Sequence, residues 1–281
     1  MNQWRKDIAS WRCGGTLYLS VPFTWMMPQA KAMAKQHKGR VVAGGPAVDL
    51  IGADWAETPG TCQFDTLSMH NPCATFTTRG CPNRCEFCAV PKIEGDFREL
   101  DTWKPAPVLC DNNLTASSHR HFERVIDSVL DFPKVDFNQG LQAGKFTRWH
   151  AGQIARLRRA KVRFAFDHVN AEGTVADALE TARAAGLHDF GVYVLIGFND
   201  TPEDALYRLE RVRSWGILPI PMRFQPLDAI QKNGYVAPGW TDFELRRMAR
   251  YYSRLIWLGH IAYEDYQPTD MPLFEAASCQ P

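Results

Sequence analysis

Three closely spaced cysteines, Cys81, Cys85 and Cys88, offer the clearest chemistry in the sequence, with the spacing C-x3-C-x2-C. A structural zinc site needs four ligands, usually from two C-x2-C pairs, and no second pair follows. A [4Fe-4S] cluster held by three cysteines instead leaves one iron open to bind a substrate or cofactor. The spacing therefore predicts a [4Fe-4S] cluster on these three thiolates, and a zinc loop or three unliganded buried thiols are the alternatives.

The aromatic residue Phe87 stands directly before the last of these cysteines. With it, the motif resembles the C-x3-C-x-aromatic-C signature of the radical S-adenosylmethionine (radical SAM) superfamily, and the resemblance covers residues 74–225. It implies that SAM binds the open iron and that the reduced cluster cleaves it to methionine and a 5′-deoxyadenosyl radical. This radical would take a hydrogen atom from a substrate. The resemblance also implies a reductant such as flavodoxin or ferredoxin.

The resemblance further implies where SAM would be held, beginning with Phe87 in the signature. Residues 192–200 are similar to the segment that packs on adenine, with Leu195 as the apolar contact and Gly197 permitting close approach, although an ordinary buried strand would look alike. The family's Gly-Gly-Glu element is not visible. Four polar residues at expected strand ends are candidates for the amino group and the ribose, and each could instead cap its strand end: Asp111, Asn113, Gln139 and Asp167.

The elements that position these residues alternate regularly between strand-like and helical patterns, which favours an α/β fold with a parallel sheet. Strands are expected near 74–79, 107–112, 134–138, 161–167, 189–196 and 217–224. Helices are expected near His119–Leu130, Phe146–Ala160, Thr174–Ala185 and Thr201–Trp215. Six such units predict a partial (βα)6 barrel of the TIM type over residues 74–235, with its active site at the carboxyl ends of the strands.

Residues 1–73 predict a small β-α-β half-domain, with a strand at Thr16–Val21, a helix at Trp25–His37 and a second strand at 40–46. It resembles a truncated, Rossmann-like cobalamin-binding domain. Because the Asp-x-His-x-x-Gly element that supplies the lower histidine is missing, we expect no cobalamin, and the half-domain could simply cover one edge of the barrel. Residues 236–281 form a C-terminal extension, in which Asp242–Leu258 predicts a docking helix.

The composition is that of a folded protein. The 281 residues suffice for one barrel-sized domain or two ordinary ones, and 45% hydrophobic with 22% charged residues argues against a disordered or fibrous chain. No apolar run approaches the about 18 residues needed to cross a bilayer. The N-terminus lacks the apolar core of a signal peptide. We therefore expect a cytoplasmic protein without membrane contact, whose cysteines serve as ligands, catalytic groups or core residues.

The net charge of +1 gives no general attraction to polyanions, but residues 145–163 contain seven basic and no acidic residues. This run predicts a possible nucleic-acid contact, and the alternative is the solvated outer face of a helix. The basic residues that would make the contact are Lys145, Arg148, Arg156 and Arg159.

Five further cysteines leave alternatives open. Cys13, Cys62 and Cys73 precede the signature, as do the cysteines that hold a second cluster in radical methylthiotransferases, but three ordinary packed or surface thiols are the other interpretation. Cys110 lies on an expected strand and is a candidate hydrogen-atom donor or a routine buried thiol. Cys279 lies near the C-terminus.

These observations predict a radical SAM enzyme that acts on a small molecule or peptide, which the sequence does not identify. The first alternative is radical modification of a nucleobase in RNA or DNA, including methylthiotransferase-like chemistry. The second is a non-catalytic iron-sulfur electron carrier, for which a fourth cysteine ligand would normally close the site.

Overall fold

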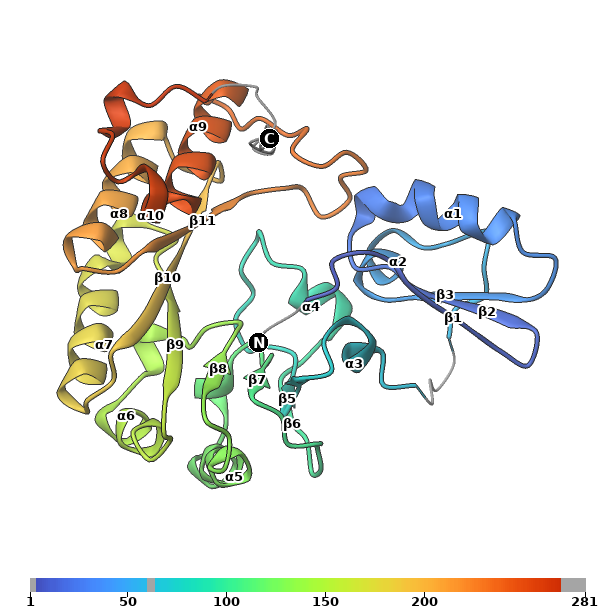
Figure 1. Cartoon of the computed structure of the whole chain (residues 1–281), viewed down its shortest axis with the longest axis horizontal. Helices are drawn as coiled ribbons and strands as arrows, with labels where there is room; N and C mark the ends of the chain where they lie inside the picture. The colour runs from blue at the N-terminus through green and yellow to red at the C-terminus, as the bar shows by residue number, and fades with distance from the viewer. Residues whose placement is uncertain (1–3, 60–63, 269–281) are drawn as a thin grey trace, which may run out of the picture.

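A six-stranded parallel sheet organises most of the chain in the computed structural model, which describes residues 4–59 and 64–268 (Figure 1). Its strand order is β11-β10-β9-β8-β7-β4, so that each successive strand lies beside the one before it. The strands are β4 (Ala74–Thr75), β7 (Val108–Leu109), β8 (Val135–Phe137), β9 (Ala160–Ala165), β10 (Asp189–Ile196) and β11 (Pro219–Arg223). The predicted α/β class with a parallel sheet is confirmed.

Four helices connect these strands and cover the same outer face of the sheet (Figure 1). They are α5 (His119–Val129), α6 (Arg148–Ile154), α7 (Glu172–Ala184) and α8 (Pro202–Ser214). Short polar side chains begin two of them, because Ser118 accepts a hydrogen bond from the His121 N–H and Thr201 accepts one from the Asp204 N–H. Helix α6 ends six residues earlier than predicted, since residues 155–159 must turn the chain back into β9.

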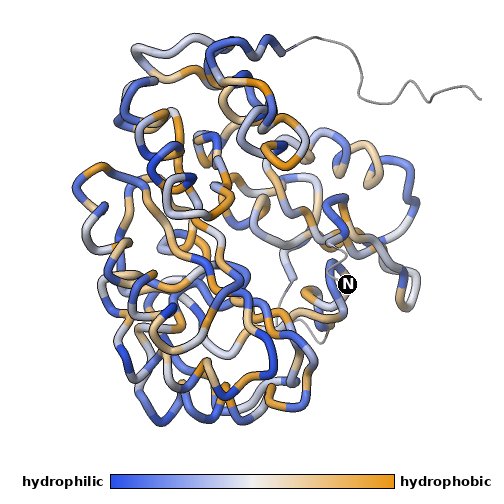
Figure 2. The backbone as a smooth tube through the Cα atoms, turned by 60° about the vertical axis from the view of Figure 1, so that its left-hand side comes forward, coloured by the Kyte–Doolittle hydropathy of each residue, from blue (hydrophilic) through white to orange (hydrophobic). Residues whose placement is uncertain are grey.

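The two faces of the sheet differ in chemistry. Along β9 and the residue after it, Val162, Phe164 and Phe166 are fully buried against the helices, in one core that includes α5 to α8. Lys161 and Arg163, which alternate with them, point to the other face, where they pair with Asp189 and Asp136 from the neighbouring strands. Figure 2 accordingly shows hydrophobic segments in the middle of the molecule and hydrophilic ones in the peripheral loops.

The N-terminal sheet has its own small core. In it β2 (Thr16–Ser20) pairs in parallel with β3 (Val41–Gly44), and α1 (Met27–Lys35) connects the two, as the sequence predicts. An additional antiparallel strand, β1 (Ala9–Cys13), pairs with β2 through a hairpin at Gly14 and Gly15, which have φ values of +55° and +78°. That pair of glycines is a hairpin signal that the β-α-β interpretation missed.

The predicted first strand, 74–79, divides into two. Residues 74–75 form β4, whereas β5 (Thr78–Arg79) leaves the sheet and pairs antiparallel with β6 (Arg98–Glu99). Other short elements lie along the chain. They are the helices α2 (Pro46–Ile51), α3 (Thr66–His70) and α4 (Val90–Ile93), and the 3-10 turns η1 (Thr24–Met26), η2 (Leu114–Ala116), η3 (Ala143–Lys145), η4 (Val169–Ala171) and η5 (Tyr263–Asp265). The loop between β5 and β6 carries the cysteine motif.

The predicted C-terminal helix is broken at Arg254 into α9 (Asp242–Ser253) and α10 (Leu255–Leu258). Leu245 and Met248 are buried on α9, which packs beside β11, as expected. Ile256, whose spacing from Leu245 and Met248 predicts that it shares their docking face, is instead 71% exposed, so that prediction is wrong. The break changes the helical phase, because Arg254 has φ −121° and ψ 20°, outside the helical region.

Candidate functional site

The carboxyl ends of the parallel strands meet at one end of the sheet, and the cysteine loop lies there, directly after β4 and β5. Polar loops follow β7, β8 and β9 at the same end. In open parallel sheets, this is the end where side chains from different strands converge on a ligand. The site is therefore built from residues that are far apart in the chain.

Asp111 anchors the start of the cysteine loop. Its Oδ1 accepts the backbone N–H of Thr77 at 2.7 Å, the backbone N–H of Thr78 at 2.5 Å and the Thr78 hydroxyl at 2.9 Å. Burial raises the pKa of the Asp111 carboxyl, while the N–H groups of Thr78 and Thr77 oppose that rise. These bonds draw residues 77–78 away from the sheet, which explains why the predicted first strand divides. Asp111, predicted to contact SAM, thus binds the chain through Oδ1, whereas its Oδ2 is buried without a hydrogen-bond partner.

Glu94 holds the next part of the loop from its other side. Its Oε2 accepts the backbone N–H of Gly80 at 2.7 Å and the Asn112 side-chain amide at 2.9 Å, and it pairs with Arg79 at 3.1 Å. The side chain of Glu94 is nearly buried, so these bonds act in a setting of low polarity. The residue before Cys81 is therefore held by a carboxylate that no sequence pattern singled out.

Replacing Gly80 by alanine is expected to destabilise the loop, since Gly80 has φ +72° and an added Cβ would lie 2.3 Å from the Asp96 carbonyl oxygen. Gly95 is the matched control, because it has φ +71° but nothing within 4 Å of an added Cβ. Gly95→Ala should cost about 1–2 kcal/mol, the strain of a left-handed alanine. Gly80→Ala should cost clearly more in urea unfolding, and equal costs for the two variants would contradict the steric argument.

The three cysteine side chains influence one another electrostatically. Burial raises the pKa of the Cys85 thiol, and the neighbouring Cys88, Cys81 and Asp167 raise it further. Burial likewise raises the pKa of Cys88, with smaller contributions from Cys81 and Asp167. A bound cation would relieve this crowding of negative charge, because metal binding favours the thiolate form.

Cys81 is the best supported of the three sulfurs. Its Sγ accepts the backbone N–H of Asn83 at 3.4 Å and the side-chain amide of Asn113 at 3.6 Å. N–H groups directed at sulfur stabilise the thiolate, the form that binds metal. Within residues 4–59 and 64–268, however, no three His, Cys, Asp or Glu side chains are arranged to hold a single metal ion.

An aromatic row connects the loop to the far strands. The Phe87 ring meets Phe198, after β10, edge to face with centroids 5.4 Å apart, and Phe198 packs on Phe224, after β11, at 4.7 Å. Phe224 in turn contacts Tyr235 at 5.3 Å. Phe87 thus contributes packing between the cysteine loop and β10. Sequence reasoning assigned no role to the other three rings. Phe198 and Phe224 follow β10 and β11 within two residues, which was the available signal, whereas Tyr235 lies in the later loop before α9.

Other predicted SAM contacts are distributed differently. Asp167 lies at this end, where its Oδ1 accepts the Leu195 N–H at 3.2 Å and burial raises its carboxyl pKa. Leu195 is half-buried and Gln139 is exposed. Gly197 has φ +79°, and an added Cβ would lie 2.9 Å from Leu245. The close approach of Leu245 on α9 therefore explains why position 197 is a glycine, and no ligand is needed for that explanation.

A buried ion pair supports the turn after β10. Asp200 accepts the N–H groups of Gly197 and Phe198 at 3.0 and 3.1 Å through Oδ1, and its Oδ2 pairs with Arg208. Arg208 also donates to the carbonyl oxygens of Phe166 and Leu195. The pair therefore fixes the chain where Phe198 meets Phe87. The sequence suggested no role for either member, although Asp200 is the last residue of the 192–200 segment.

The remaining cysteines lie in separate places. Cys13 is exposed at the end of β1 in the N-terminal sheet, whereas Cys73 borders a small apolar cluster that contains Cys110. Cys110 is 1% exposed, and burial raises its pKa to about 12. Cys62 and Cys279 lie outside the described residues. Of the described cysteines before the motif, Cys13 is thus exposed on the N-terminal sheet and Cys73 packs beside Cys110, which packs as an apolar side chain.

The basic run is divided by the fold. Lys145 and Arg148 are exposed near the carboxyl end of β8, whereas Arg156 and Arg159 follow α6 at the opposite end of the sheet. Arg156 pairs with Asp127 at 2.5 Å. The four residues therefore lie in two pairs, one near each end of the sheet.

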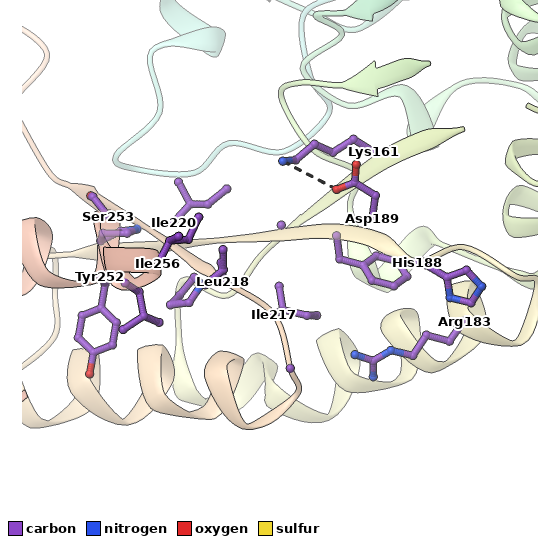
Figure 3. Close-up of a pocket in the computed structure, with 16 residues that line it drawn as sticks. Lys161, Arg183, His188, Asp189, Ile217, Leu218, Ile220, Tyr252, Ser253 and Ile256 are labelled. Carbon is purple, nitrogen blue, oxygen red and sulfur yellow. Dashed lines mark ion pairs between the residues drawn. The ribbon is translucent and has the colours of Figure 1, made fainter. Parts of the chain in front are cut away.

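A cavity of about 680 Å³ lies at the opposite, amino end of β10 and β11 (Figure 3). Residues from these strand starts and from the junction of α9 and α10 line it, among them Asp189, Ile220 and Ile256. Its lining is largely apolar and contains none of the predicted site residues. Because parallel sheets bind ligands at the carboxyl ends of their strands, this cavity is separate from the candidate site.

No protein-family model, curated protein or solved structure matches the chain. The residues that the structure describes include no helix with the length and hydrophobicity that a membrane crossing requires. The arrangement of the cysteine loop is therefore the basis on which a function is assigned.

Proposed function

We propose that the chain is a radical SAM enzyme whose parallel sheet is a partial (βα)6 barrel and whose Cys81, Cys85 and Cys88 hold a [4Fe-4S] cluster. The observation that carries the proposal is the meeting of these thiols with Asn113 and Asp167 at the carboxyl end of the sheet. When bound, the reduced cluster would supply the electron that splits SAM into methionine and a hydrogen-abstracting 5′-deoxyadenosyl radical.

Three cysteine ligands suit a [4Fe-4S] cluster with one open iron, whereas a structural zinc ion takes four ligands. The irons of a [4Fe-4S] cluster occupy separate corners of a cube, so its ligands surround a larger volume than the ligands of one zinc ion. Cys81, Cys85 and Cys88 all lie on one loop, between β5 and β6. Asp111 and Glu94 hold the loop by its backbone and leave the sulfurs available.

Several side chains remain to bind SAM and the substrate. Asp167 offers a carboxylate beside Cys85 and Cys88, and Leu195 presents a half-buried apolar surface on the next strand. We infer a small-molecule or peptide substrate, because the basic residues are divided between the two ends of the sheet. A flavodoxin or ferredoxin would supply the electron, and the exposure of Cys85 supports its approach from solvent.

The N-terminal half-domain is assigned a covering role, without cobalamin. It lies beside the β4 edge of the large sheet (Figure 1), and the Thr24 hydroxyl donates a hydrogen bond to the Ala229 carbonyl in the loop after β11. Its Gly44 packs against Pro59, which an added Cβ would approach to 2.8 Å. Purified protein that retains stoichiometric cobalamin would overturn this assignment.

The direct test of the proposed function is anaerobic reconstitution with iron and sulfide. The protein should bind about four irons per chain. With dithionite and SAM it should then release 5′-deoxyadenosine, measured by chromatography, and omission of dithionite is the control. Protein that binds no iron, or loaded protein that leaves SAM intact, would refute the proposal.

The triple variant Cys13→Ala, Cys62→Ala, Cys73→Ala distinguishes one cluster from two. A second cluster would bring the wild type to about eight irons, whereas one three-cysteine site predicts about four in both proteins. The variant should keep its iron and its SAM cleavage, with some loss of stability because the half-buried Cys73 packs like a small apolar group. Loss of half the iron and half the brown absorbance would favour methylthiotransferase-like chemistry instead.

A further inference from the structure

We infer that Asn113 is a positioning residue that donates a hydrogen bond to the sulfur of Cys81 and thereby raises the reduction potential of the cluster. This inference rests on the proposed function. It also changes the role of Asn113, which the sequence analysis treated as a candidate contact for SAM. Asn113 can donate to the sulfur only if its amide nitrogen, and not its oxygen, faces Cys81.

A closed ring of three hydrogen bonds sets the orientation of the amide. The backbone N–H of Gln142 donates to the Thr115 hydroxyl oxygen at 3.0 Å, and the Thr115 hydroxyl donates to Asn113 Oδ1 at 2.9 Å. Asn113 Nδ2 completes the ring by donating to Gln142 Oε1 at 2.8 Å. A backbone N–H can only donate, so the Thr115 oxygen is the acceptor in its bond with Gln142. The Thr115 hydroxyl proton is therefore free to bond the Asn113 oxygen.

The opposite orientation would be costly. A flipped Asn113 amide would turn its oxygen toward Cys81 and leave the hydroxyl proton of Thr115 without this acceptor. Asn113 is 2% exposed and Thr115 is 5% exposed, so water could not easily replace the lost bond. The ring therefore directs one Nδ2 proton at Gln142 and the other at the Cys81 sulfur, 3.6 Å away.

This donor distinguishes Cys81 from the other two ligands. Cys88 receives the backbone N–H of Val90, and in the described part of the chain Asn113 is the side-chain amide placed against a sulfur of the motif. It also comes from a different strand end, so it links the ligand to β7 and, through Gln142, to the loop after β8. A donor held in this way needs no rearrangement when the charge on the cluster changes.

Hydrogen bonds to cluster sulfurs stabilise the more negatively charged, reduced state, and they are among the factors that set cluster potentials. Replacing Asn113 by leucine removes the donor while keeping a similar side-chain volume. The net value of one such bond corresponds to a change of about five- to tenfold in the ratio of reduced to oxidised cluster at a fixed potential. The variant should therefore be harder to reduce than the wild type.

The test compares reconstituted wild type, Asn113→Leu and Thr115→Val, each poised at a series of potentials and examined by electron paramagnetic resonance. Iron content should remain about four per chain in all three. The midpoint potential should become more negative in Asn113→Leu and should shift less, in the same direction, in Thr115→Val, which frees the amide without removing it. Thermal unfolding of the iron-free proteins measures any separate effect on stability.

Unchanged midpoint potentials in iron-loaded variants would overturn the inference and leave the proposed function intact. Loss of iron from both variants would also overturn it, because these residues would then only maintain the loop. If Asn113→Leu alone fails to load, the shift in Thr115→Val decides the question. A wild type that binds no cluster would instead refute the proposed function, and this inference with it.

Discussion

Replacing Cys85 by alanine is expected to reduce the iron content of reconstituted protein from about four per chain to near zero. Two thiolates would remain on the loop, too few to hold the cluster against loss to solvent. Release of 5′-deoxyadenosine should fall by more than about 100-fold. Substituting residues that only contact metal ligands already costs up to about 100-fold in metal affinity or activity, and loss of a ligand should cost more. The measurements are iron analysis and chromatography of the SAM reaction.

Cys13→Ala is the matched control, since Cys13 is also an exposed cysteine but lies on β1 in the other sheet. It should retain its iron and its activity. Urea unfolding of both iron-free variants checks that neither substitution changes the stability of the polypeptide. A Cys85→Ala protein that still cleaves SAM would show that the motif does not hold the cluster in the proposed way.

Replacing Asp200 by alanine is expected to lower the free energy of unfolding by about 3–5 kcal/mol. Arg208 is only 1% exposed and Asp200 6% exposed, so the substitution would leave a guanidinium buried without its partner. It would also remove the acceptor of the N–H groups of Gly197 and Phe198, which form the turn after β10. Urea unfolding of the iron-free protein measures the loss.

Lys134→Ala provides the comparison, because Lys134 pairs with Asp189 at 2.7 Å on the surface, where both side chains are exposed. Such pairs contribute less than about 1 kcal/mol. The double variant Asp200→Ala, Arg208→Met removes both buried charges and should recover part of the stability. Equal losses for Asp200→Ala and Lys134→Ala would contradict the role assigned to the buried pair.

The alternation of strand and helix patterns was enough to predict the parallel sheet and the order of its strands, because each βα unit is local in the chain and its connection to the next strand is short. The helix breaks were not predictable in the same way. The end of α6 at Ile154 and the interruption at Arg254 depend on where the chain must turn to reach its next contact.

The spacing of Cys81, Cys85 and Cys88 determined the candidate metal ligands, since their separation is short enough for one loop to bring them together. The roles of the surrounding polar residues depended on tertiary structure. Asp111 and Asn113 follow a strand, as predicted, but one accepts the N–H groups of residues more than thirty positions earlier and the other donates to Cys81. A sequence pattern locates a side chain at a strand end, whereas its hydrogen-bond partner is set by which distant loop the packed sheet places beside it.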